Sequence, residues 1–150
     1  MVVAVEKIAD ILADLKKDPN YNFQMFMDLT AVDWIDRQPR FDLVYHLYSI
    51  DHNHRLRIKV PLADGQTVPS ACSLWSIVNW MEREMWDLYG IKFNGHPNLT
   101  RILMYEEFKG HPLRKDFDYD HRQPLIEDSW PSKPFQVNIK GLKIHRPGND

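Results

Sequence analysis

Apolar residues recur every three or four positions in two stretches of the chain, and this spacing predicts two helices. The first is expected over residues 3–17, ending where Asp18 and Pro19 interrupt the pattern. The second follows Pro69 and ends at Gly90, because glycine is favoured just past the end of a helix. The apolar positions of the two helices are Ile8, Ile11, Leu12 and Leu15, then Leu74, Val78, Met81, Met85 and Leu88.

Between these helices apolar and polar residues alternate, which predicts three strands that each bury one face. We expect them over residues 23–31, 41–47 and 55–60, with the last two joined as a hairpin that turns at residues 51–53. The expected buried positions are Phe23, Met25, Met27, Leu29 and Ala31, then Phe41, Leu43, Tyr45 and Leu47, then Leu56, Ile58 and Val60.

The C-terminal part of the chain has neither pattern. Six of the ten prolines lie between Pro97 and Pro147, which favours an extended conformation. The segment still carries large apolar residues such as Trp130 and Phe135, too many for a solvated tail. We therefore expect an α+β fold, a small mixed or antiparallel sheet with two packed helices, over residues 1–92. Residues 93–150 would be a long extended C-terminal arm that wraps a partner and belongs to the same single domain.

Composition narrows the choice of function. At 150 residues and 43% hydrophobic, the chain can bury one core, and it contains no apolar run long enough to cross a membrane. A net charge of -2 gives no global attraction to nucleic acid or an anionic membrane. A basic stripe of Arg55, Arg57 and Lys59 could still meet an acidic partner, a phosphate or a nucleic acid. The simpler interpretation is a solvated strand face that pairs with neighbours such as Asp42.

Residues with reactive side chains give weak signals. Cys72 cannot form an internal disulfide or hold an iron–sulfur cluster alone, and its place at the start of the second helix favours a structural role. No glycine-rich loop for NADH or ATP is present. A free-standing metal-dependent hydrolase is one hypothesis, although the spacing matches no known metal motif. Its candidate ligands are His52, His54, His96, His111 and His121, with Glu106, Glu107 and Asp116.

The second helix and the following segment carry two further features. Three tryptophans lie beside charged residues on the helix surface turned away from the expected core, and Arg83 and Asp87 are spaced for an ion pair. This surface could serve a partner. Beyond the helix the tripeptide Gly-His-Pro occurs twice, at residues 95–97 and 110–112, where proline keeps the preceding histidine extended.

Residues 82–117, EREMWDLYGIKFNGHPNLTRILMYEEFKGHPLRKDF, strongly resemble the complex I 30 kDa subunit family, which forms the C subunit of the bacterial NADH-quinone oxidoreductase. The resemblance extends upstream through residues 28–34, 45–49 and 52–57, and downstream through residues 122–124. The positions that match the family motif, expected to be interface or structural residues, are Glu82, Arg83, Glu84, Asp87, Tyr89, Gly90, Gly95, His96, Pro97, Arg101, Leu103, Gly110, His111, Pro112, Arg114, Lys115 and Asp116.

The resemblance implies a scaffold subunit without redox groups or catalytic residues of its own. Its partners would be the quinone-site subunit of the 49 kDa type and the cluster-bearing subunits, in a complex that uses NADH, FMN, iron–sulfur clusters and quinone. Its location would be peripheral, on the cytoplasmic side of a bacterial inner membrane, in a short member without fused domain or transit peptide. An equivalent subunit of a membrane-bound hydrogenase or another donor-linked dehydrogenase is the alternative. The sequence departs from the family at residues 116–122, where acids alternate.

Overall fold

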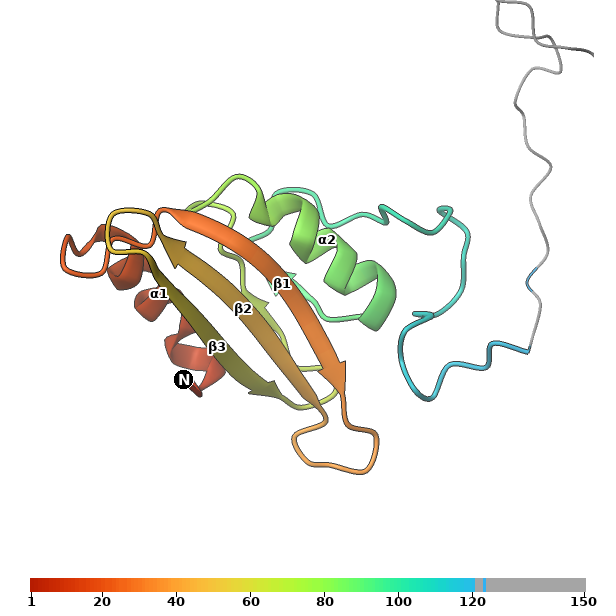
Figure 1. Ribbon diagram of the computed structural model, residues 1–150. Coiled ribbons are helices and arrows are strands. Elements are labelled where there is room, and N and C mark those ends of the chain that lie inside the picture. The colour runs from red at the N-terminus through yellow and green to blue at the C-terminus, as the bar shows by residue number, and fades with distance from the viewer. Residues whose placement is uncertain (121–122, 124–150) are drawn as a thin grey trace, which may run out of the picture.

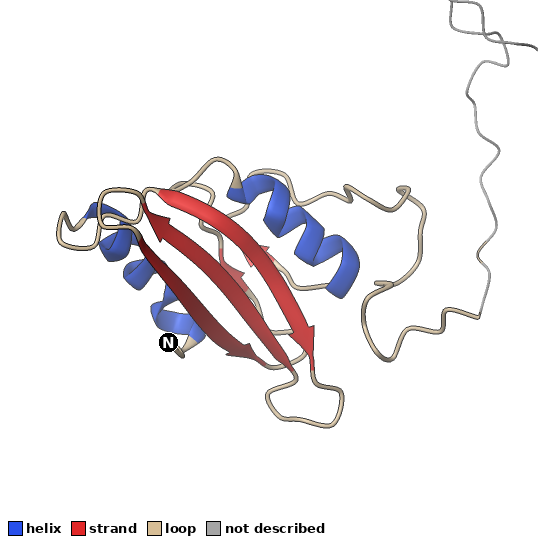
Figure 2. Cartoon of the chain, in the orientation of Figure 1, coloured by secondary structure: helices blue, strands red, loops and turns tan. Residues whose placement is uncertain are grey.

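The computed structural model describes residues 1–120 and 123, and it confirms the α+β class. Its centre is an antiparallel three-stranded sheet in the order β1-β2-β3, with both helices on one face (Figure 1). Two short strands pair in parallel next to this unit (Figure 2). The elements are a 3-10 turn at Val5–Lys7, α1 at Ile8–Lys17, β1 at Met25–Asp33, β2 at Phe41–Ser49, β3 at His54–Leu62, β4 at Val68–Pro69, α2 at Val78–Tyr89 and β5 at Phe93–Asn94.

The hairpin β2-β3 confirms the predicted inward-facing positions, but Asp42 and Val44 on the other face of β2 are buried as well. The two strands pair from Phe41 opposite Leu62 to Ser49 opposite His54, so the turn covers residues 50–53. Their inward residues form the centre of the core between sheet and helices, because each side chain there is almost completely removed from water. The predicted members of this group are Phe41, Leu43, Tyr45, Leu47, Ile58 and Val60, all buried, with Leu56 partly buried.

The first strand differs from its prediction because of a β-bulge. Phe26 pairs with Leu47 and Asp28 with His46, which leaves Met27 as an extra residue in β1. The inward alternation therefore shifts by one position there. Phe26 enters the core against Tyr45 and Trp75, whereas Met25 and Met27, predicted to be buried, are exposed.

Both helices begin later than the periodicity predicts. Residues 1–3 lie along β3 instead of in a helix, since the amide of Val3 donates to the carbonyl of Lys59. The second helix begins at Val78, and Leu74 lies in the turns before it. Its end is as predicted, because Gly90 takes a left-handed conformation with φ of 78° as the C-cap.

The surface of α2 is more buried than its sequence suggests. Trp75, predicted on this helix, lies in the turns before it, is in the core, and donates from its indole N–H to the carbonyl of Gln24, 2.9 Å away. Glu82 and Asp87, expected on an exposed face, are fully buried. The reason is that α2 packs on two sides, against β1 and against the chain that follows β5.

That following segment is the described part of the predicted arm. Residues 95–120 contain no helix or strand, in agreement with an extended arm, and residues 99–115 contact α2 and the end of the sheet. The boundary at residue 92 stays a prediction, and His121, Trp130 and Phe135 lie outside the described residues. Among the residues that are described, no helix is long and apolar enough to cross a membrane.

Candidate functional site

The residues of the family-like motif meet where α2 contacts the arm, and Asp87 is at the centre of this junction. One carboxylate oxygen accepts hydrogen bonds from three successive amides of the arm, those of Ile102, Leu103 and Met104, at 2.8–3.0 Å. The other oxygen lies 2.6 Å from the guanidinium of Arg101. Burial acts to raise the pKa of Asp87, but these hydrogen bonds outweigh it and lower the pKa. Asp87 is therefore a buried carboxylate that stays ionised and fixes the arm.

Arg101 connects Asp87 to a later part of the arm. Its guanidinium donates to the carbonyls of Phe108 and Gly110, at 2.7 and 3.0 Å, and lies over the rings of Trp86 and Phe108. The predicted pair between Arg83 and Asp87 is wrong. Arg83 instead donates to the carbonyls of Thr100 and Arg101, because the arm supplies closer partners to both side chains.

The second Gly-His-Pro tripeptide docks on the end of α2. The imidazole Nδ1 of His111 donates to the backbone carbonyl of Asp87, 2.9 Å away, and the ring packs against Trp86. The ring also lies directly over Gly90, where an added Cβ would be 2.7 Å from it. Glycine is required at this position both for its positive φ and for the close approach of the histidine.

A second junction, formed by charged side chains, joins the arm to the end of the sheet. Arg40, just before β2, contacts Asp33 and Asp116, each at 2.8 Å, and Arg114 contacts Asp64 at 2.6 Å and Asp116 at 3.0 Å. The amide of Lys115 also donates to Asp33. The guanidinium groups of Arg40 and Arg114 lower the pKa of Asp116 well below its usual range. Three carboxylates and two arginines thus hold residues 114–116 against the end of the sheet.

The remaining motif residues have more peripheral places. Leu103 is exposed, Pro97 and Gly95 lie on the surface, and burial raises the pKa of the half-buried Tyr89 hydroxyl. Glu84 and Pro112 are partly buried. Beside the junction, a hollow lined by Phe41, Asp64, Tyr89 and Arg114 has a volume of about 10 Å³. That is room for about one water molecule and far too little for a nucleotide or quinone.

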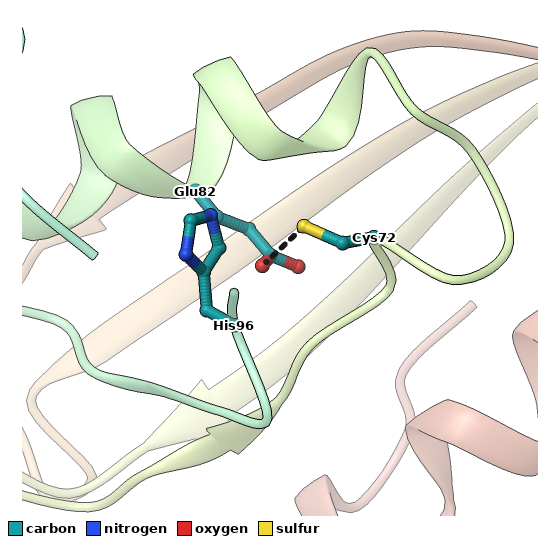
Figure 3. Close-up of side chains that lie close together, drawn as sticks. All are labelled: Cys72, Glu82 and His96. Atoms are coloured by element: carbon teal, nitrogen blue, oxygen red, sulfur yellow. Dashed lines mark hydrogen bonds between the residues drawn. The ribbon is translucent and has the colours of Figure 1, made fainter. Parts of the chain in front are cut away.

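The structure also brings together Cys72, Glu82 and His96, a cluster that no sequence motif indicates (Figure 3). Glu82 accepts hydrogen bonds from the hydroxyl of Ser70 at 2.6 Å, the amide of Ala71 at 2.8 Å and the thiol of Cys72 at 3.4 Å. Burial, the largest effect, raises the pKa of Glu82. It also raises the pKa of Cys72 to about 11, which agrees with a structural rather than a nucleophilic thiol.

The cluster has the residue types of a metal site but not the free ligand atoms. Nδ1 of His96 accepts the amide proton of Asn98 at 3.0 Å, so Nε2 carries the ring proton and donates to the carbonyl of Asn79. The ligand atoms all lie within 4.8 Å of one another, so it is their hydrogen bonds, and not their spacing, that argue against a metal site. We interpret the three residues as structural. The hydrogen bonds of Glu82 hold the 70–72 turn on α2, and that of His96 holds the first Gly-His-Pro segment there.

The histidines of the hydrolase hypothesis do not converge within the described chain. His52 and His54 lie side by side near the β2-β3 turn, where the imidazole of His52 contacts the carbonyl of Pro19. His111 is engaged with α2, as described above. Within residues 1–120 and 123, the group Cys72, Glu82 and His96 is the single cluster of three or more such residues with metal-ligand spacing.

Comparison with known proteins decides the family. The family described as "Respiratory-chain NADH dehydrogenase, 30 Kd subunit" matches residues 1–123. The chain belongs to this family. A relative from Rhizobium rhizogenes, named as the C subunit of NADH-quinone oxidoreductase, is 49% identical over 117 residues, which is 78% of this chain and 58% of the relative. The relative of the same name from Citrifermentans bemidjiense is 47% identical over 118 residues, 78% of this chain and 72% of the relative.

The 30 kDa family match covers both junctions and ends where the described residues end. The chain nevertheless spans little more than half the length of several relatives, such as 54% of the protein of the same name from a Methylobacterium species. The resemblance on residues 82–117 is confirmed by these matches. The structure adds that the charged motif residues Arg83, Asp87, Arg101, Arg114 and Asp116 bind within the chain.

Proposed function

We propose that this chain is a non-redox scaffold subunit of a proton-translocating NADH:quinone oxidoreductase. In this function it holds the cluster-bearing subunits and the quinone-site subunit of the 49 kDa type in a geometry fit for electron transfer from NADH to quinone. Family membership supports the complex, since the relatives are named as its C subunit. The scaffold role is supported by the two junctions.

One observation carries the scaffold role. The carboxylates and guanidinium groups of the motif point into hydrogen bonds that fix the path of the arm, and Asp87 is completely removed from solvent. A group that must exchange protons with a substrate needs access to it and a pKa near the working pH. The pKa values of Asp87 and Asp116 are instead lowered, away from neutral pH. These carboxylates stay ionised and hydrogen-bonded, so they stabilise one conformation of the arm. This suits a subunit that presents a rigid surface to its partners.

The redox groups of the proposed complex belong to its other subunits. An iron–sulfur cluster needs about four thiolate or imidazole ligands, and this chain has one cysteine, whose thiol is engaged with Glu82. The clusters would therefore bind outside this chain, and we propose the same for NADH, FMN and quinone. We place the subunit at the periphery of the complex, on the cytoplasmic side of a bacterial inner membrane, with membrane association through its partners.

The test is an affinity purification of the full chain from gently solubilised native membranes, followed by mass spectrometry and an assay of NADH:quinone activity. We expect cluster-bearing and quinone-site subunits in stoichiometric amounts, with NADH-dependent quinone reduction. If hydrogenase subunits are recovered instead, the electron donor of the proposed complex would be one other than NADH. Recovery of the chain alone would contradict the scaffold role.

A further inference from the structure

The outer face of β3, opposite the helices, carries three cations in a row that form no ion pair within the described part of the chain. Arg55, Arg57 and Lys59 alternate with the core residues of the strand, so all three point to the same face. Among the described residues, none of the three forms an ion pair. By contrast, Arg37, Arg40, Arg101 and Arg114 each pair with a carboxylate of the chain.

Asp28 on β1, Asp42 on β2 and Asp51 in the β2-β3 turn already have other partners. Asp42, which the sequence suggested as a neighbour for the row, accepts hydrogen bonds from the indole of Trp34 and the guanidinium of Arg37. Lys59 acts on Asp42 only through its charge. Asp51 accepts from the amides of Asn22 and Gln24, and Asp28 lies 3.8 Å from the imidazole of His46. The row is therefore not compensated by the sheet that bears it.

The geometry of the row restricts what can neutralise it. Residues two apart on a strand are about 7 Å from each other, which is also the spacing of alternate side chains in an extended peptide. The guanidinium of Arg55 lies 4.9 Å from the ring centre of Tyr48, and this stacking holds one end of the row in place. Asp28 and Asp42 lie on β1 and β2 and Asp51 in the β2-β3 turn, and the chain has a net charge of -2. These charges oppose a long polyanion such as nucleic acid more than a short acidic segment, which needs to meet only the three cations.

We infer that the basic row of Arg55, Arg57 and Lys59 binds an extended segment of a neighbouring subunit that carries Asp or Glu at alternate positions. The inference rests on the proposed function and adds the surface and the chemistry of one contact. The sheet face away from the helices would then face a protein partner, while the motif junctions shape the chain on the helix side.

A zero-length carbodiimide cross-linker tests this contact directly, because it joins an amine to a carboxylate only when the two touch. The intact complex, purified through the full chain, is cross-linked and analysed by mass spectrometry. We expect Lys59 joined to an Asp or Glu of another subunit, and no such link in Lys59→Arg, which keeps the charge. If the complex contains all its subunits but Lys59 is cross-linked only within this chain, or not at all, the inference is overturned and the proposed function stands. A chain that recovers no subunits would instead contradict the proposed function.

Charge reversal gives a second measure. Arg57→Glu with Lys59→Glu is compared with Lys17→Glu with Lys92→Glu, which changes the net charge equally at exposed lysines on α1 and next to β5. We expect the first pair to lower the recovery of partner subunits about tenfold or more, as the loss of interfacial charge pairs does. The control pair should recover them normally. Equal recovery by both variants would overturn the inference, as would an association that nuclease or phospholipid removal abolishes.

Discussion

The imidazole of His111 lies so close to the Cα of Gly90 that a methyl group there would be 2.7 Å from the ring. This contact joins the C-cap of α2 to the second Gly-His-Pro segment, and the hydrogen bond from His111 to the carbonyl of Asp87 fixes it. One glycine and one histidine thus join the end of the helix to the arm at this point.

Gly90→Ala should destabilise the protein through both strain and collision. The φ of 78° disfavours alanine, and its Cβ would displace His111, so we expect a loss of about 2–4 kcal/mol in the free energy of urea unfolding. Gly65→Ala is the matched control, because Gly65 has a φ of 79° with open space around it. Only the strain, about 1 kcal/mol, applies there. Equal losses in the two variants would show that the histidine contact contributes nothing.

Asp87→Asn should loosen the arm. The substitution keeps the shape but places an amide N–H2 against either three backbone N–H groups or Arg101, and leaves that arginine without its carboxylate. Breaking a buried pair in this way costs about 3–5 kcal/mol, and protease sensitivity within residues 101–113 should rise. Asp64→Asn removes a carboxylate that is 47% exposed, and we expect less than about 1 kcal/mol. A milder effect at Asp87 than at Asp64 would contradict the central role of Asp87.

The charged junction at Asp116 predicts an acid-labile contribution to stability. The pKa of Asp116 is lower in the folded than in the unfolded chain, because Arg40 and Arg114 favour the carboxylate. The stabilisation is therefore complete above the unfolded pKa near 4 and is lost as pH falls below it. Unfolding midpoints measured from pH 7 to pH 3 should decline less steeply in Asp116→Asn than in the wild type. Parallel curves would show that the folded pKa of Asp116 is not lowered.

Cys72 should react slowly with thiol reagents near neutral pH. With its pKa raised to about 11, chiefly by burial, only about one thiol in a thousand is ionised at pH 8. The rate of modification by iodoacetamide should rise continuously up to about pH 11 and become ordinary in urea. Glu82→Gln removes a negative charge that raises this pKa, so the rate profile should move to lower pH. Fast labelling of the folded wild type at pH 7 would contradict the buried, engaged thiol.

Arg114→Ala should lower the amount of assembled complex more than it lowers quinone reduction per assembled complex. Arg114 binds Asp64 and Asp116, so its loss weakens the attachment of the arm to the sheet, while Arg40 and the amide of Lys115 still hold it. In cells that carry the full complex, we expect the amount of assembled complex to fall about threefold or more, while quinone reduction per assembled complex stays normal. Lys92→Ala, at an exposed lysine, serves as the control. Full assembly with lost turnover would assign Arg114 a direct part in the reaction.

The sequence by itself determined the elements whose burial follows from local periodicity. The inward-facing positions of β2 and β3, the apolar face of α1, and the glycine at the end of α2 all appear as predicted. In each case the deciding interaction is between residues a few positions apart or between neighbouring strands of one hairpin, so the pattern along the chain carries the information. The motif of residues 82–117 likewise identified the family before any contact was known.

Only the tertiary structure decided which side chains meet across long separations. The bulge at Met27 depends on the pairing of β1 with β2, and it exposes two methionines that strict alternation would bury. Asp87 leaves its expected helical neighbour Arg83 because the arm offers three amides and Arg101. Burial of Asp87 on α2 requires the arm to fold back on the helix, and burial of Glu82 requires the 70–72 turn to pack on it. Both steps depend on the summed energy of contacts between distant segments, which the spacing of residues along the chain does not encode.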